Sequence, residues 1–173
     1  MVGMAERMLH TIDTGDAEMK NGNGKACLFW IALSEAAGAL SGVLSRGGIQ
    51  AYSSQAVQPG FSPPPVVFPI VWSILYGLMG FGMARIRRVG GGKQAQNLFV
   101  VQLVVNFFWP LIFFNAQAFG FTFFWLLLLW VLAALMALAF YRQDKAAGLA
   151  QIPYLLWLTF AAVLNFFVWQ LNG

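Results

Sequence analysis

SPPPVVFPIVWSILYGLMGFGMARIRR, residues Ser62–Arg88, begins with a run of three prolines and ends in a cluster of arginines. Between them the segment carries no charge, and an uncharged apolar run of this length predicts a helix that crosses a membrane. Trp72 and Tyr76 lie four residues apart, so two large, partly polar rings share one face of that helix. We therefore expect the rest of the chain to form helices that assemble around this face.

The composition of the whole chain points to the same environment. Of its 173 residues, 60% are hydrophobic, 16% are aromatic and only 9% are charged, whereas soluble domains average about 25% charged residues. The formal net charge is +4, but the basic residues cluster at the ends of apolar runs, which is typical of a membrane topology signal. This pattern disfavours both a water-soluble globule and a nucleic-acid-binding protein.

Five apolar runs predict an all-α, integral membrane bundle of five transmembrane helices. The predicted spans are residues 26–45, 66–84, 98–115, 121–141 and 150–171. Residues 1–25 are polar and of mixed charge, which predicts a flexible tail. Residues 46–60 are rich in Gly, Ser and Gln, which predicts a long loop between the first two spans. Pro110 should kink the third span and release a backbone carbonyl.

Basic residues are distributed unevenly between the two sides of this bundle. The side that holds the N-terminus carries nine of them: Arg7, Lys20, Lys25, Arg85, Arg87, Arg88, Lys93, Arg142 and Lys145. The other side carries only Arg46. The positive-inside rule therefore predicts a cytoplasmic N-terminus. The tail resembles neither a secretory signal nor an Arg-rich transit peptide, which favours the plasma (inner) membrane of a bacterium.

The first span combines a stripe of small residues with one acid. The small residues recur every four positions, at Ser34, Gly38 and Gly42, which predicts close approach of another helix. Glu35 is the only acidic residue inside an apolar run, and an ionisable group at that depth is a functional candidate. The alternative is a neutral or hydrogen-bonded Glu35 packed against a polar neighbour such as Gln102 or Asn106.

Polar and bulky aromatic residues of three spans define a candidate binding site: Trp72, Tyr76, Asn106, Trp109 and Trp157. Converging, their faces would enclose an apolar pocket with a few hydrogen-bonding groups, the usual make-up of a small-molecule site. A flat aromatic ligand would stack on the indoles. The alternative is that the tryptophans lie at the membrane interfaces and that Asn106 only joins helices.

The residue types exclude several chemistries. The single histidine, His10, lies in the tail, so no histidine within a span can ligate a metal or a haem iron. The chain shows no phosphate-binding loop, no nucleophile elbow and no paired carboxylates. We expect no metal site and no required cofactor. A porphyrin or haem bound here as a ligand would be held by its face and edges.

Three spans together resemble the TspO/translocator protein family. The segments are PPPVVFPIVWSILYGLMG, QLVVNFFWPLIFF and PYLLWLTFAAVLNFFVWQLN, and they occur in the family's order and spacing between about residues 26 and 172. The resemblance implies a five-helix membrane bundle, often dimeric, that binds porphyrins and in some members sterols and benzodiazepine-type ligands. Carried over by position, it implies that these residues contact the ligand: Trp72, Tyr76, Asn106, Trp109, Trp157, Ala161 and Leu164.

The resemblance leaves three functions open. The first is a tetrapyrrole-binding protein that acts as a sensor or in the transport or turnover of porphyrins. The second is an enzyme that degrades bound porphyrin in the presence of light and oxygen, with Trp72 and Trp157 as its redox-active residues. The third is a structural or partner-binding membrane protein with no pocket between the helices.

The sequence also departs from the family pattern. Phe61 and Val66 replace tryptophans beside the loop prolines, which leaves Phe61 as the candidate lid residue. Phe166 and Gln170 replace the Tyr and basic residue of the sterol pattern, which predicts weak or no recognition of cholesterol. The small-residue dimer stripe of the third span is lost, so that Gly38 and Gly42 become an alternative interface between copies. Trp125 stands where many members carry an acid.

Overall fold

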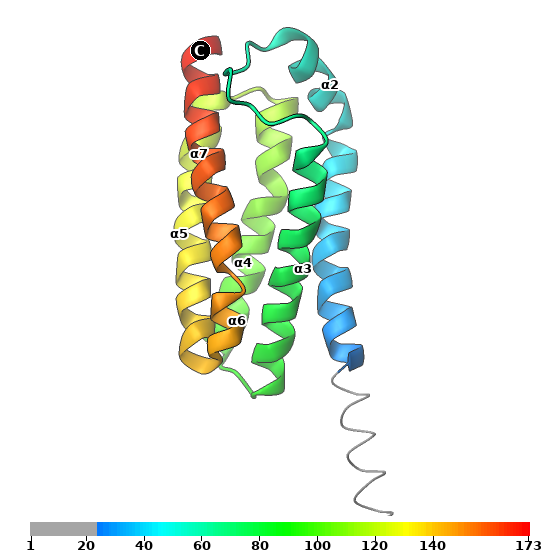
Figure 1. The fold of residues 1–173 in the computed structure, drawn as a ribbon, viewed down its shortest axis with the longest axis vertical. Coiled ribbons are helices and arrows are strands. Elements are labelled where there is room, and N and C mark those ends of the chain that lie inside the picture. The colour runs from blue at the N-terminus through cyan, green and yellow to red at the C-terminus, as the bar shows by residue number, and fades with distance from the viewer. Residues whose placement is uncertain (1–23) are drawn as a thin grey trace, which may run out of the picture.

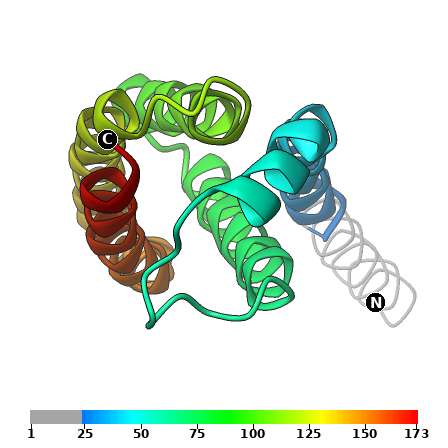
Figure 2. The same ribbon diagram turned by 90° about the horizontal axis from the view of Figure 1, so that it is seen from above.

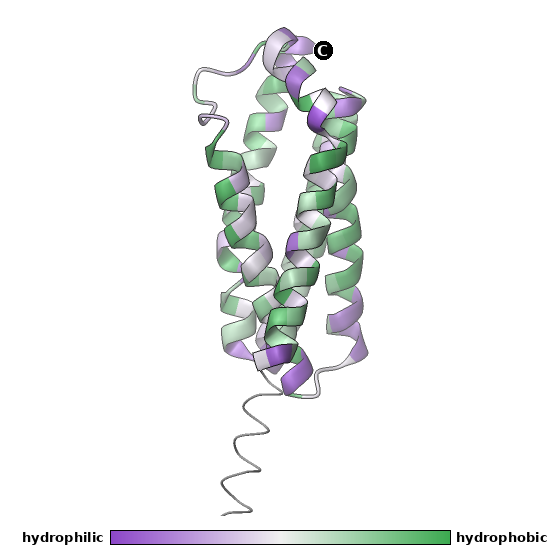
Figure 3. Cartoon of the chain, turned by 90° about the vertical axis from the view of Figure 1, so that its right-hand side faces the viewer, coloured by the Kyte–Doolittle hydropathy of each residue, from purple (hydrophilic) through white to green (hydrophobic). Residues whose placement is uncertain are grey.

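The computed structural model describes residues 24–173 as a bundle of long helices (Figure 1). Five helical segments are long and apolar enough to cross a membrane: Gly24–Leu44, Val67–Arg88, Lys93–Asn115, Phe119–Gln143 and Lys145–Asn172. Hydrophobic residues cover their shafts, and hydrophilic residues gather at the two ends (Figure 3). The predicted all-α membrane bundle of five helices is thus confirmed. The predicted tail lies outside the described residues, except for Gly24 and Lys25.

The helices after the first are α2 to α7, with bounds that generally exceed the predicted spans. The long ones are α3 (Val67–Arg88), α4 (Lys93–Pro110), α5 (Phe119–Gln143) and α7 (Ile152–Asn172). The short α6 (Lys145–Leu149) precedes α7. Seen from above, α5 lies between α4 and α7, while the first helix stands beside α3 (Figure 2). The helix α3 in turn packs against α4 and α6.

The predicted loop 46–60 is wrong over most of its length, because Arg46–Gln55 form the helix α2. The composition of this segment gives little intrinsic reason for a helix. Its Tyr52 ring, however, packs within 5.3 to 6.1 Å, between ring centroids, of the rings of Phe113, Phe114 and Phe119. Tertiary packing of this kind commonly outweighs local propensity.

The first helix packs closely on α3 at two glycines. A Cβ added to Gly38 would overlap the ring of Tyr76, and one added to Gly80 would meet the backbone of Trp30 and Ile31. The predicted close approach at the small-residue stripe is therefore confirmed at Gly38. Tyr76 of the same chain thus already contacts Gly38, and the interface between copies at Gly38 and Gly42 stays a prediction. Gly42 has open space around the position of a Cβ.

Pro110 ends α4 and is followed by a π-helical turn, Leu111–Asn115. Proline has no N–H to donate into the helix, and the hydrogen bonds shift after it. The amide of Leu111 donates to the carbonyl of Phe108, three residues back. The carbonyl of Phe107 accepts a hydrogen bond of 2.7 Å from Ser41 Oγ on the first helix. The carbonyl of Phe107, which this shift leaves free, thus helps to hold two helices together. The predicted release of a carbonyl on the face of Asn106 stays a prediction.

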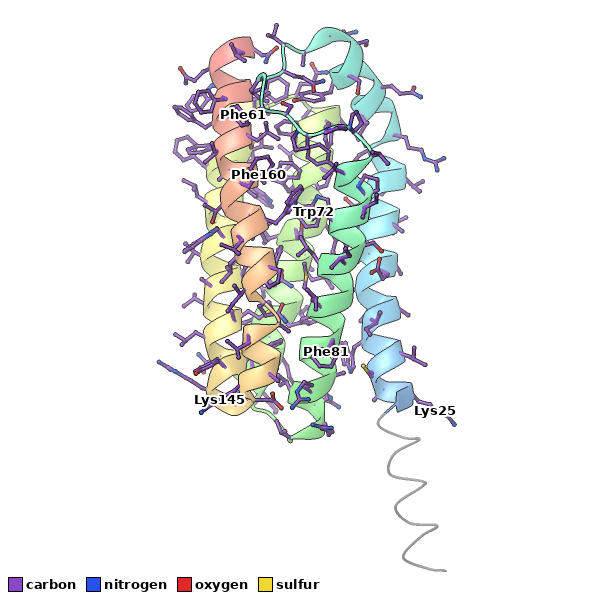
Figure 4. The ribbon with its side chains drawn as sticks, viewed as in Figure 1. Lys25, Phe61, Trp72, Phe81, Lys145 and Phe160 are labelled. Atoms are coloured by element: carbon purple, nitrogen blue, oxygen red, sulfur yellow. The ribbon has the colours of Figure 1, made fainter. Side chains whose placement is uncertain are left out.

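Charged residues close one end of the bundle. Lys25 and Lys145 both lie there (Figure 4). Asp144, between α5 and α6, accepts two hydrogen bonds from Arg85 Nε at 2.9 and 3.0 Å and forms an ion pair of 2.8 Å with its Nη2. The same carboxylate accepts from the amide of Ala147 and so caps α6. The guanidinium of Arg85 lowers the pKa of Asp144 below its ordinary value.

Candidate ligand-binding site

The aromatic residues of α3 and α7 point toward each other. The rings of Trp72 and Tyr76 lie 5.5 Å apart, and the ring of Trp72 lies 6.3 Å from that of Tyr154 on α7. One turn earlier, Phe68 of α3 lies 5.9 Å from Trp157 of α7. Trp72 accordingly occupies the space between these two helices (Figure 4). The contact between α3 and α7 here consists of these aromatic rings.

Six of the seven predicted contact residues lie in or against one cluster. Tyr76, Asn106 and Ala161 are buried, while Trp72, Trp109 and Trp157 are partly buried and pack on the cluster. Asn106 joins it through a hydrogen bond to the buried Tyr154. Leu164 is partly buried on α7 and is not part of this cluster within residues 24–173. The tryptophans therefore face the bundle, as the pocket hypothesis requires.

A chain of hydrogen bonds crosses the cluster. The hydroxyl of Tyr154 donates to Gln102 Oε1 at 3.0 Å and accepts from Asn106 Nδ2 at 3.1 Å. Gln102 Nε2 donates in turn to Met79 Sδ at 3.7 Å. Gln102 lies four residues before Asn106 and so shares its face of α4, but Tyr154 was not predicted from the sequence. Its position three residues before Trp157, on the same face of α7, was the available signal.

Three polar atoms of the predicted site are buried without a hydrogen-bond partner: Asn106 Oδ1, Trp109 Nε1 and Trp157 Nε1. Nearly all buried polar atoms in proteins are hydrogen-bonded, so such exceptions require an explanation. Two other tryptophans of the bundle are hydrogen-bonded through the indole N–H. Trp125 Nε1 donates to the carbonyl of Val105 on α4 at 2.9 Å, and Trp130 Nε1 donates to Thr159 Oγ1 at 3.0 Å. Trp125, which stands where many family members carry an acid, thus joins α5 to α4 through this hydrogen bond.

Two open apolar grooves lie on the outer face of α7. The larger, about 470 Å³, is lined by Phe61, Leu156, Thr159, Phe160, Val163 and Phe167. The smaller, about 360 Å³, lies between α5 and α7. None of the seven predicted contact residues lines either groove. The predicted lid residue Phe61 packs on Phe167, with ring centroids 5.4 Å apart, and so lies at the outer groove.

The segment between α2 and α3 closes the other end of the bundle. Asn172, at the end of α7, accepts a hydrogen bond of 2.8 Å from the amide of Val57. Its side-chain amide donates back to the carbonyl of Val57 at 2.9 Å. These two bonds fasten the lid segment, residues 56–66, to the last helix.

Glu35 forms a different contact from those predicted. Its Oε2 accepts a hydrogen bond of 3.1 Å from Ser73 Oγ on α3. The expected neighbours Gln102 and Asn106 bond to Tyr154 instead. Ser73 immediately follows Trp72, so it lies on a different face of α3 from the cluster. Glu35 therefore lies in the contact between the first helix and α3, where the candidate residue Tyr76 also packs on Gly38.

These features define a class: a five-helix membrane protein with an aromatic, sparsely polar candidate site between α3, α4 and α7. The TspO/MBR family model matches residues 30–170, and the chain belongs to that family. Over 125 residues it is 39% identical to the tryptophan-rich protein TspO of Chlorobaculum tepidum, covering 70% of this chain and 79% of that one.

Two further relatives show the breadth of the family. Protein CrtK of Rhodobacter capsulatus is 34% identical over 140 residues, which is 79% of this chain and 86% of that protein. The translocator protein of Ovis aries is 38% identical over 120 residues, which is 66% of this chain and 71% of that protein. The resemblance seen in the sequence is thus confirmed.

Proposed function

We propose that this membrane protein binds a porphyrin or related tetrapyrrole between α3, α4 and α7, and acts as a sensor or in porphyrin transport or turnover. The observation that carries the proposal is the set of buried polar atoms without partners on Asn106, Trp109 and Trp157. They lie on residues that pack with the facing rings of α3 and α7. A ligand that offers both a flat aromatic face and polar edges suits this combination.

The contact between α3 and α7 supports entry of a flat ligand. The two helices meet through the Phe68–Trp157 and Trp72–Tyr154 ring pairs. Rings can turn about two side-chain torsions and stack on an inserted ligand without unfolding either helix. No histidine occurs within residues 24–173, so no imidazole there can ligate a haem iron. We propose the same stacking and edge contacts for haem as for a free porphyrin.

The test is a titration of the purified protein with protoporphyrin IX, followed by quenching of tryptophan fluorescence. We expect the double variant Trp72→Phe, Trp157→Phe to weaken binding at least tenfold, because stacking area and one indole donor are lost. Trp130→Phe is the matched control, because its indole N–H bonds to Thr159 and its side chain is exposed. Equal affinity in wild type and double variant would contradict the proposal.

A second candidate function is light- and oxygen-dependent degradation of the bound porphyrin. The observation that favours it is the contact of Trp72 with two tyrosines, Tyr76 and Tyr154, because these ring types can donate electrons to an excited ligand. Illumination of the complex separates the two candidates. Loss of porphyrin absorbance faster than for the free ligand, and slowed in the Trp72→Phe, Trp157→Phe variant, would support catalysis.

For the orientation in the membrane, we propose a cytoplasmic N-terminus in a bacterial inner membrane. The shared end of Lys25, Lys145 and the arginine cluster of α3 supports it. Reporter fusions at the two chain ends test it, since five spans place those ends on opposite sides. Weak cholesterol recognition and a homodimer remain predictions, which sterol competition and a mass measurement in detergent would test.

A further inference from the structure

We infer that Met79 fixes the direction of the hydrogen bonds in the site, so that the site selects ligands carrying an N–H or O–H donor beside a carbonyl. The inference rests on the proposed tetrapyrrole function and adds a specificity to it. Its starting point is the chain from Met79 through Gln102 and Tyr154 to Asn106.

The direction of this chain follows from the chemistry of its first member. A thioether sulfur can accept a hydrogen bond but cannot donate one. Gln102 therefore turns its NH₂ group to Met79 Sδ and its Oε1 to Tyr154. The hydroxyl of Tyr154 has one proton and donates it to Gln102 Oε1, so toward Asn106 it can act only as an acceptor.

The last member of the chain is consequently also fixed. Asn106 must present its Nδ2 to Tyr154, and its Oδ1 is left buried without a partner. A flip of the Asn106 amide would place its Oδ1 against the hydroxyl oxygen of Tyr154, whose proton is already donated to Gln102. The flip is possible only if Tyr154 donates to Asn106 instead and the Gln102 amide also flips. That reversal would bring Gln102 Oε1 against the sulfur of Met79. Met79, Gln102 and Tyr154 are thus positioning residues for one open acceptor, Asn106 Oδ1.

Each unpartnered atom sets a requirement for a ligand that reaches it. These atoms offer one acceptor, Asn106 Oδ1, and two donors, the indole N–H groups of Trp109 and Trp157. An un-ionised carboxylic acid or a primary amide carries both a donor and a carbonyl acceptor. An ester carries acceptors only and would leave Asn106 Oδ1 buried and unpaired, which costs affinity.

The experiment compares two porphyrins with the same ring, protoporphyrin IX diamide and protoporphyrin IX dimethyl ester. Affinity is measured by quenching of tryptophan fluorescence in the full-length protein. We expect the diamide to bind about tenfold more tightly than the ester, the effect of one unsatisfied buried acceptor. Neither ligand titrates near neutral pH at its side-chain groups, so ionisation does not affect the ratio. Comparing the ratio between wild type and variants then isolates the hydrogen bond from the other differences between amide and ester.

Met79→Leu keeps the volume of the side chain but removes the acceptor. Gln102 is then free to turn and Asn106 to flip, so we expect the diamide-to-ester ratio to fall toward one. Met83→Leu is the matched control, a second buried methionine of α3, and should keep the ratio. Tyr154→Phe breaks the chain at its centre and should also lower it.

The outcomes separate this inference from the proposed function. Equal binding of diamide and ester to the wild type, or an equal drop in the ratio for Met79→Leu and Met83→Leu, would overturn the inference and leave porphyrin binding standing. If neither porphyrin quenches the fluorescence, both the inference and the proposed function fail.

Discussion

The two ends of the bundle are closed by different interactions. At the basic end, an ion pair between Arg85 and Asp144 joins α3 to the start of α6, where Gly148 packs directly against the backbone of Tyr141. At the opposite end, Asn172 holds the lid segment by two hydrogen bonds that are exposed to solvent, and Phe61 of the segment packs on Phe167 of α7. From this comparison we expect the basic end to maintain the fold and the lid end to open at a lower cost in free energy.

Added volume at the basic end should have the largest effect. In Gly148→Ala, the new Cβ would lie 2.5 Å from Tyr141 Cα, where neither backbone can give way. We expect a loss of about 3 kcal/mol in stability, measured by thermal unfolding in detergent. Gly60→Ala in the lid segment is the control, because nothing lies within 4 Å of its added Cβ. Equal loss in both variants would remove the proposed difference between the ends.

Loss of the ion pair should have the next largest effect. Asp144→Asn removes the charge that Arg85 contacts, at an expected cost of about 1–2 kcal/mol near neutral pH. The folded-state pKa of Asp144 is lowered, so the carboxylate stabilises the protein at pH values above its unfolded pKa of about 3.9. This contribution is lost as the pH falls through the lower folded value. Wild type and variant should therefore converge in stability in acid, and a constant gap would refute the assignment.

At the lid end, Asn172→Ala should change local opening more than global stability. Its two exposed hydrogen bonds contribute about 1 kcal/mol or less in total. Hydrogen exchange should rise in residues 56–66, and porphyrin should dissociate several-fold faster, with little change in the thermal midpoint. Gln170→Ala, an exposed position on the same helix, is the control. An unchanged rate of hydrogen exchange in residues 56–66 would show that Asn172 does not hold the lid segment in place.

The smallest effect is expected for Tyr52→Phe. The ring of Tyr52 packs on phenylalanines near the lid, and burial raises the pKa of its phenol. Removal of the hydroxyl keeps the ring contacts, so we expect a change in stability within about 0.5 kcal/mol. Tyr52→Ala should cost clearly more. Similar losses in the two variants would show that the hydroxyl, and not the ring, anchors α2.

Much of the fold could be predicted from the sequence because lipid imposes a simple rule. A span must satisfy its backbone internally, so long uncharged runs are helices. The segment 46–55 was missed because its helix depends on the packing of Tyr52 against the π-helical turn and α5, which no local pattern reveals. The partner of Glu35 was missed for a related reason. The contacts of Gly38 and Gly80 set the rotation of the first helix about its axis. That rotation brings Glu35 to Ser73.

The sequence predicts which helix faces carry the candidate site, but it does not predict the hydrogen bonds between those helices. Periodicity alone places Asn106 and Trp109 on one side of α4, and the structure brings that side to the cluster. The bond of Asn106 to Tyr154 depends on how α4 and α7 are set along their axes, which the sequence does not state. The position of Phe61 at the outer groove likewise depends on the path of the lid segment.

The tryptophans of the bundle also allow ligand binding to be followed by NMR. The indole N–H groups of Trp125 and Trp130 are already occupied by Val105 and Thr159, while those of Trp109 and Trp157 are free. In a spectrum of ¹⁵N-labelled indoles, the first pair should keep its chemical shifts as porphyrin is added. The second pair should move downfield as its protons find acceptors. Four resonances would thus report occupancy, with their own internal reference, in a single sample.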